Sequence, residues 1–210
     1  MNPELIRMGI VFLHLVACCV ALGLVFTSDV AMIKGLLRPT PDAQDEEHLT
    51  HLHKTISRAL LVLWLTGIGL VSFDILAKGV GTLANPKLQS KIALVVLLTL
   101  NGMVLQRQVM PFLHRAGSLM KLTFPRRMVA LFVGSVSGVS WFYAALLGIG
   151  RPLNWKYSLT EILMAYPFLI VGGFVGMVFL TAWAEYQGRQ AVRTTEPADS
   201  WEILPRPLLT

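Results

Sequence analysis

The residue best suited to chemistry in this sequence is His14, which lies in a long apolar stretch beside Phe12, Leu13 and Leu15. An ionisable side chain in such a stretch needs a partner or a function, because placing it in hydrocarbon is costly. A neutral imidazole there either forms a hydrogen bond with a neighbouring helix or serves as an axial ligand of haem or as a metal ligand. Asn101, midway along a later apolar stretch, could be the polar partner of His14, which would favour the purely structural interpretation. For the cofactor interpretation, His14 and Asn101 are the predicted binding residues.

Four charged residues are expected at similar depth near one end of the predicted helices: Arg7, Asp74, Lys91 and Glu161. The two carboxylates can neutralise the two cations, so a salt-bridge cluster is the simplest interpretation. A proton path or a site for a substrate anion is the alternative. Lys91, just inside its apolar stretch, is the member of this group for which a catalytic role is predicted.

The densest group of potential metal ligands is the segment 45–53, whose histidines are His48, His51 and His53. If this segment is helical, Glu47 and His51 share a face because they are four residues apart. The ends of other predicted helices bring two further ligands to the same side, Asp29 and His114. The pattern predicts a site for a divalent metal, and the alternative is a solvated acidic helix start.

The chain has 210 residues, of which 54% are hydrophobic and 14% are charged, and its mean hydropathy is +0.62. Soluble proteins are about 45–50% apolar and about 25% charged, so the composition indicates a membrane protein. It excludes intrinsic disorder, and the two adjacent cysteines exclude a disulfide-stapled module. The basic residues are scattered between apolar runs, which argues against binding to nucleic acid.

Five stretches approach or exceed the roughly 20 apolar residues that a membrane-spanning helix needs. They cover residues 5–26, 56–76, 88–113, 128–148 and 159–182. The sequence therefore predicts an all-α, polytopic bundle of five transmembrane helices, which forms one domain over residues 1–186 in contact with the lipid bilayer. Residues 187–210 are predicted to form a polar C-terminal tail, and Pro167 is predicted to kink or unwind the fifth helix.

The lysines and arginines are unevenly divided between the two sides of the predicted bundle. One side carries twelve of them and the other carries six. Because cytoplasmic loops are enriched in Lys and Arg, this count predicts a bacterial-type inner membrane protein with its N-terminus outside and its C-terminus in the cytoplasm.

Glycines spaced four residues apart occur in the last two stretches: Gly134 and Gly138 in the fourth, Gly172 and Gly176 in the fifth. This spacing places small residues on one helix face, where a neighbouring backbone can approach closely. The interpretation is packing within the bundle, with a seam for a second copy, a membrane-protein partner or a groove for a flat ligand as the alternatives.

Three features occur in the same order in a known family: a first span with His14 at mid-membrane, the segment 53–60 leading into a span with Trp64, and a third span opening at Lys91. In these features residues 5–115 resemble the HemJ-type protoporphyrinogen IX oxidases and, more loosely, the CopD-type copper-resistance membrane proteins. The resemblance implies functional roles for His14 and Lys91 and an association with haem b. This chain departs from the family at Ala21, where the family has Trp, and at residues 101–102, where the family has a His.

Three functions are therefore compared. The first is a haem- or porphyrin-associated redox protein, which as an enzyme would be a membrane oxidoreductase acting on a porphyrin-like substrate. His14 would be its ligand, Lys91 would meet a propionate, and Arg58 would assist from the cytoplasmic end. The second is a metal or small-solute permease with the histidine cluster as its port, and the third is a non-catalytic membrane subunit or scaffold. Only the first uses His14, Lys91 and the resemblance together.

Overall fold

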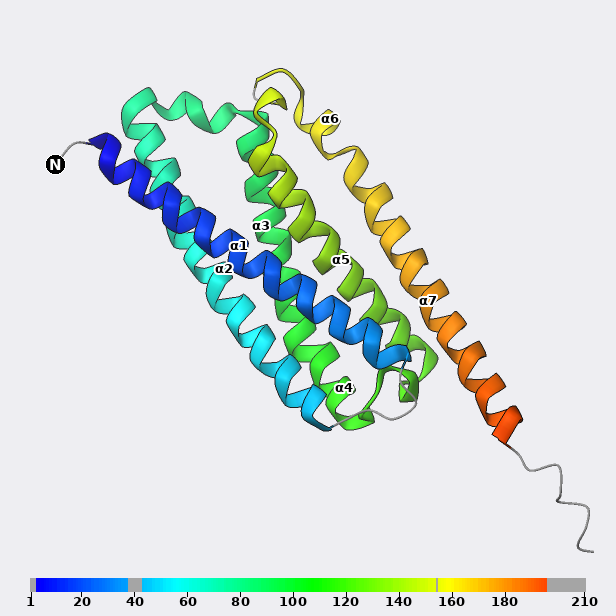
Figure 1. Cartoon of the computed structure of the whole chain (residues 1–210). Helices are drawn as coiled ribbons and strands as arrows, with labels where there is room; N and C mark the ends of the chain where they lie inside the picture. The colour runs from blue at the N-terminus through cyan, green and yellow to red at the C-terminus, as the bar shows by residue number, and fades with distance from the viewer. Residues whose placement is uncertain (1–2, 38–42, 154, 196–210) are drawn as a thin grey trace, which may run out of the picture.

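The computed structural model describes residues 3–37, 43–153 and 155–195, and these ranges are helical with no β-strand (Figure 1). Five helical segments are long and apolar enough to cross a membrane: Pro3–Lys34, Lys54–Lys78, Pro86–Ala116, Phe124–Ile149 and Leu159–Gln190. They contain all five predicted stretches. The predicted all-α bundle of five potential membrane-spanning helices is therefore confirmed.

The chain runs up and down the bundle. Helices α1 (Pro3–Leu37) and α2 (Ala43–Lys78) are followed by the 3₁₀ turn η1 (Val80–Ala84) and α3 (Pro86–Val104). The π-helical turn η2 (Leu105–Val109), α4 (Met110–Ala116) and the 3₁₀ turn η3 (Leu119–Lys121) lead to α5 (Phe124–Ile149). The 3₁₀ turn η4 (Arg151–Leu153) precedes α6 (Leu159–Leu163) and α7 (Ala165–Thr195), which remains helical beyond residue 186. In Figure 1, α1 crosses in front of the bundle and α7 lies along its outer edge.

Local sequence signals fix several of the helix ends. Asn85 precedes α3, and its side chain accepts the N–H of Lys87 at 3.0 Å, which satisfies one of the first backbone donors. At α6, the side chains of Ser158 and Glu161 form a reciprocal capping box. Gly117 ends α4 with a φ of 67°, a conformation that glycine adopts without strain.

Helices α1 and α2 form the most extensive contact in the bundle, and small side chains make it close. Ala17, Ala21 and Val25 lie four residues apart on α1 and are buried in one cluster with Ala59 and Leu63 of α2. Small residues let two helix axes approach and gain dispersion contacts that lipid cannot supply. Ala21 is completely buried, so this contact leaves no room for the Trp of the resembled family.

The predicted interruption near Pro167 is confirmed by the break between α6 and α7. Proline has no N–H to donate to the preceding turn, so the carbonyls there need other partners. The hydroxyl of Tyr143, on α5, donates to the carbonyl of Ile162. The hydroxyl of Tyr166 lies 2.7 Å from the hydroxyl of Ser140, also on α5. Helix α5 thus forms one hydrogen bond before the break and one after it.

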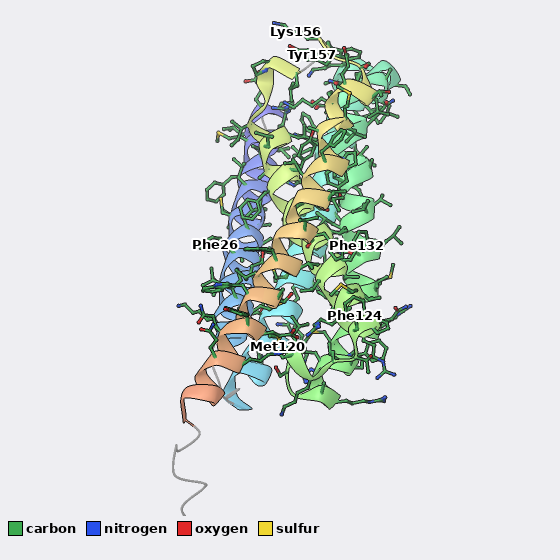
Figure 2. The ribbon with its side chains drawn as sticks, turned by 90° about the vertical axis from the view of Figure 1, so that its right-hand side faces the viewer. Phe26, Met120, Phe124, Phe132, Lys156 and Tyr157 are labelled. Atoms are coloured by element: carbon green, nitrogen blue, oxygen red, sulfur yellow. The ribbon has the colours of Figure 1, made fainter. Side chains whose placement is uncertain are left out.

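Large apolar side chains point outward along the whole bundle, as expected for helices that contact lipid. Figure 2 shows Phe26 and Phe132 at similar height on its flanks, and both are exposed. Lys156 and Tyr157 lie at the end where α6 begins, and Phe124 lies nearer the other end (Figure 2).

Candidate functional site

The candidate site is centred on His14, which is half-buried on α1. Its Nδ1 lies 2.8 Å from the hydroxyl oxygen of Thr66 on α2. The Thr66 hydroxyl oxygen also lies 2.7 Å from the carbonyl of Val62 and 3.3 Å from that of Leu63 in its own helix, and either can accept its single proton. With that proton on a backbone carbonyl, the Thr66 oxygen accepts from Nδ1 of a neutral His14. This tautomer is assigned from the hydrogen-bond network, and in it Nε2 keeps its lone pair.

The imidazole ring is held at one place on α2. A Cβ added at Gly67 would lie 3.8 Å from Cε1 of His14, which is ordinary van der Waals contact. Consecutive residues of α2 thus provide a hydrogen bond at Thr66 and, because Gly67 has no side chain, room for the ring beside it. The hydrogen bond to Thr66 limits rotation of the ring.

Lys91, half-buried on α3, completes the site. Its ammonium contributes to the electrostatic environment of His14 and of Cys18, one turn further along α1, without a hydrogen bond to either side chain. Among the residues that the structure describes, none forms a hydrogen bond or an ion pair with the Lys91 side chain. The site therefore combines an imidazole with an ammonium group that has no carboxylate partner among the described residues.

The expected charged cluster forms only in part. Asp74 pairs with Arg7 at 3.5 Å, as predicted, and also with Lys78 at 3.6 Å. Glu161 instead accepts the N–H of Ser158 at 2.8 Å in the capping box of α6. The expected neutralisation of Lys91 by these carboxylates is therefore wrong, because helix capping and the Arg7 pair already use them.

Asn101 lies elsewhere in the bundle. Its side-chain nitrogen donates to the carbonyl of Val133 on α5 at 3.0 Å. The expected pairing of Asn101 with His14 is wrong, because the face of α3 that carries Asn101 is turned toward α5 rather than α1. Asn101 joins α3 to α5. No described contact connects it to the candidate site, so its role at a cofactor stays a prediction.

The structure does not bring Arg58 to His14 and Lys91. Arg58 is exposed on α2, eight residues before Thr66. At about 1.5 Å per residue, this separation is about 12 Å along the helix axis. A catalytic role for Arg58 next to Lys91 therefore has no geometric support.

The predicted metal ligands give a limited result. His51 is exposed near the start of α2, while the side chains of His48 and His53 lie outside the described residues. Within the part of the chain that the structure describes, no group of three or more His, Cys, Asp or Glu side chains could hold a metal ion. The metal site of His48, His51 and His53 stays a prediction, and the described contacts place Asp29 against α5.

The glycines divide into two groups. A Cβ added at Gly138 would lie 3.3 Å from a carboxylate oxygen of Asp29 on α1, and one added at Gly173 would lie 3.3 Å from Val139 on α5. These two glycines therefore pack the bundle. Gly172 and Gly176, in contrast, are exposed on α7.

Sequence reasoning missed the two threonines that hold α1, α2 and α3 together. Besides Thr66, Thr99 on α3 accepts the indole N–H of Trp64 at 3.0 Å and donates to the carbonyl of Val95 at 2.8 Å. In both cases a threonine within a span bonds to its own helix and also to a side chain of another helix. Polar residues within an apolar span are the signal that could have identified these contacts.

Comparison of the chain with protein-family models, with curated proteins and with solved structures finds no match. The chemistry of the site therefore has to be argued from its own atoms. An imidazole with a free lone pair can bind a metal ion or take a proton, and an ammonium group in the same part of the bundle can bind an anion.

Proposed function

We propose that this protein is a membrane redox protein that binds haem or a related porphyrin at His14 and Lys91. The observation that carries the proposal is the hydrogen bond between Nδ1 of His14 and Thr66, because in the tautomer with the proton on Nδ1 it leaves Nε2 as an oriented electron-pair donor. Haem-bound and metal-bound histidines are commonly held in this way through their second nitrogen. When bound, a haem would supply one-electron redox chemistry.

The residues present fit such a ligand. Lys91 has no carboxylate partner in the described chain, and an ammonium group forms a charge-assisted hydrogen bond with a carboxylate such as a propionate. The other histidines with described side chains, His51 and His114, lie before one candidate span and near the end of another. The donor set thus consists of one histidine nitrogen and one cation, and the resemblance over residues 5–115 supports the same pair.

Each residue of the site has a separate task in this proposal. Thr66 holds the imidazole in one orientation and one tautomer. His14 presents Nε2, and Lys91 recognises the acidic edge of the ligand. As an enzyme, the protein would be an oxidoreductase acting on a porphyrin-like substrate.

We also propose that the bundle lies in a bacterial-type inner membrane with its N-terminus outside. The twelve-to-six division of Lys and Arg supports this orientation. Fusing alkaline phosphatase or green fluorescent protein to the C-terminus tests it. Fluorescence without phosphatase activity is expected, and the reverse pattern would overturn the orientation.

The decisive experiment for the function is an absorption spectrum of the purified protein during titration with haemin. The wild type should develop a Soret band that saturates at one haemin per chain. His14→Ala should lose the spectrum of the histidine-ligated iron, whereas His114→Ala, a histidine substitution outside the site, should keep it. Lys91→Gln should keep the spectrum but weaken haemin binding about tenfold, which corresponds to about 1.4 kcal/mol.

Two outcomes would overturn the proposal. The first is a helical, monodisperse wild type that takes up no haemin. The second is a His14→Ala variant whose spectrum and affinity equal those of the wild type.

A further inference from the structure

Asp29 is a charged residue of the bundle interior that the proposed function does not use. It is half-buried on α1, inside the candidate span Pro3–Lys34. One of its carboxylate oxygens faces Gly138 of α5, where an added Cβ would lie only 3.3 Å away. In the described chain, no hydrogen bond or ion pair engages this side chain. A carboxylate at such a position is costly, which makes it a candidate for function.

Asp29 lines a small polar cavity on one side. This cavity has a volume of about 60 Å³, and its polar lining comes from Ser28, Ser57, Gln106 and Ser137. A polar cavity of this size is large enough to hold water. Gln106 belongs to the π-helical turn η2, and such turns often occur at functional sites. Asp29 can therefore be hydrated from within the bundle.

On its other side Asp29 lines a larger groove of about 590 Å³ between α1, α5 and α7. Gly134, Gly138 and Gly173 are the small residues of its lining, and Phe142 and Leu169 are among the large apolar ones. Figure 1 shows α1 and α7 on either side of α5. A volume of this size is typical of sites for small organic ligands.

Asp29 is also the polar group of the groove that remains available to a ligand. Ser135 already donates to the carbonyl of Leu131 at 2.8 Å, and Tyr143 donates to the carbonyl of Ile162. Within the described lining, Lys, Arg and His are absent, so no cation of the groove balances the carboxylate. The groove thus presents one acidic group on an otherwise apolar surface.

We propose that this groove binds a lipophilic cation, with the positive group of the ligand against Asp29 and its apolar part along the glycines of α5 and α7. Charge complementarity selects this class of ligand. A neutral lipid tail would leave the carboxylate without a partner, and an anion would be repelled by it. A cation gains an interaction strengthened by the low dielectric of the groove.

Two probes of equal shape and opposite charge test the proposal in the wild type. The protein is placed in nanodiscs of zwitterionic lipid, and binding of tetraphenylphosphonium and of tetraphenylborate is measured by equilibrium dialysis against empty nanodiscs. Saturable binding of one tetraphenylphosphonium per chain is expected, and tetraphenylborate should show none. Equal binding of the two ions, or no saturable binding of the cation, would overturn the proposal.

Three variants locate the site. Asp29→Asn keeps the shape of the side chain but removes its charge, and Gly134→Leu fills the groove at a position where an added Cβ meets no described atom within 4 Å. Each should weaken binding of the cation about tenfold or more. Gly176→Leu is the matched control, because Gly176 is equally uncrowded but exposed on α7 outside the groove. Wild-type binding by Asp29→Asn and Gly134→Leu, or a comparable loss in Gly176→Leu, would overturn the assignment.

Discussion

Replacing Thr66 with Val removes the hydroxyl that orients His14 while nearly preserving the side-chain shape. The Nδ1–H of His14 then loses its acceptor at 2.8 Å, and we expect the contact between α1 and α2 to weaken. The carbonyl of Val62, which also accepted the Thr66 hydroxyl at 2.7 Å, keeps its backbone partner in the helix. The loss should therefore come almost entirely from the bond to His14.

The magnitude follows from the position of this bond. Side-chain hydrogen bonds between membrane helices contribute about 0.6 kcal/mol on average and up to about 1.7 kcal/mol. His14 is half-buried and the bond has good length, so about 1 kcal/mol of unfolding free energy is expected, or about fivefold in the equilibrium constant. If haemin binds as proposed, loss of the orienting partner should also weaken its binding by about 10-fold or more.

A double-mutant cycle measures the coupling directly. Unfolding in mixed detergent micelles, followed by tryptophan fluorescence, gives the free energies of Thr66→Val, His14→Leu and the double variant. Thr27→Val is the matched control, because the hydroxyl of Thr27 is exposed and donates to the carbonyl of Gly23 in its own helix. A coupling energy near 1 kcal/mol is expected for Thr66 and near zero for Thr27. Additive effects of Thr66→Val and His14→Leu would refute the inferred bond and tautomer.

Two further substitutions test the packing of α7 in the same unfolding assay. Glu185→Ala should lower the free energy of unfolding by about 1–3 kcal/mol, because it removes the carboxylate that pairs with the largely buried guanidinium of Arg127. The Nε of this guanidinium already lacks a partner in the described chain. A decrease below about 0.5 kcal/mol, the size of an ordinary surface change, would contradict this expectation. Gly173→Leu should lower the free energy of unfolding by about 1–3 kcal/mol through steric overlap with Val139. Gly172→Leu, on the exposed face, should have little effect, and equal costs for the two leucines would contradict the packing described.

The five spans could be predicted because length and apolar composition are properties of each segment alone. The break before Pro167 was also local, since it follows from a missing N–H. The role of Glu161 could have been recognised too, because Ser158 and Glu161 have the spacing of a capping box. Signals contained in a few adjacent residues were thus sufficient for the architecture.

The partners of the polar residues could not be predicted in the same way. In a soluble helix, apolar periodicity shows which face is buried, but a membrane helix is apolar on the faces toward lipid and toward its neighbours. The sequence therefore does not show that Asn101 faces α5 or that Thr66 faces His14. The separation of Arg58 from Lys91 has the same origin, because it depends on how α2 and α3 are positioned against each other.

The two attachments of α7 to α5 have a mechanical consequence. Tyr166 is hydrogen-bonded to Ser140 near one end of the helix, and Glu185 forms an ion pair with Arg127 toward the other end. The distance between these two contacts along the helix axis is about 28 Å at the usual helical rise, and Gly173 packs against α5 between them. With both contacts in place, α7 can widen the groove only by bending between them. Loss of the Glu185 contact would allow the C-terminal part of α7 to move away from α5 while the contact at Tyr166 remains.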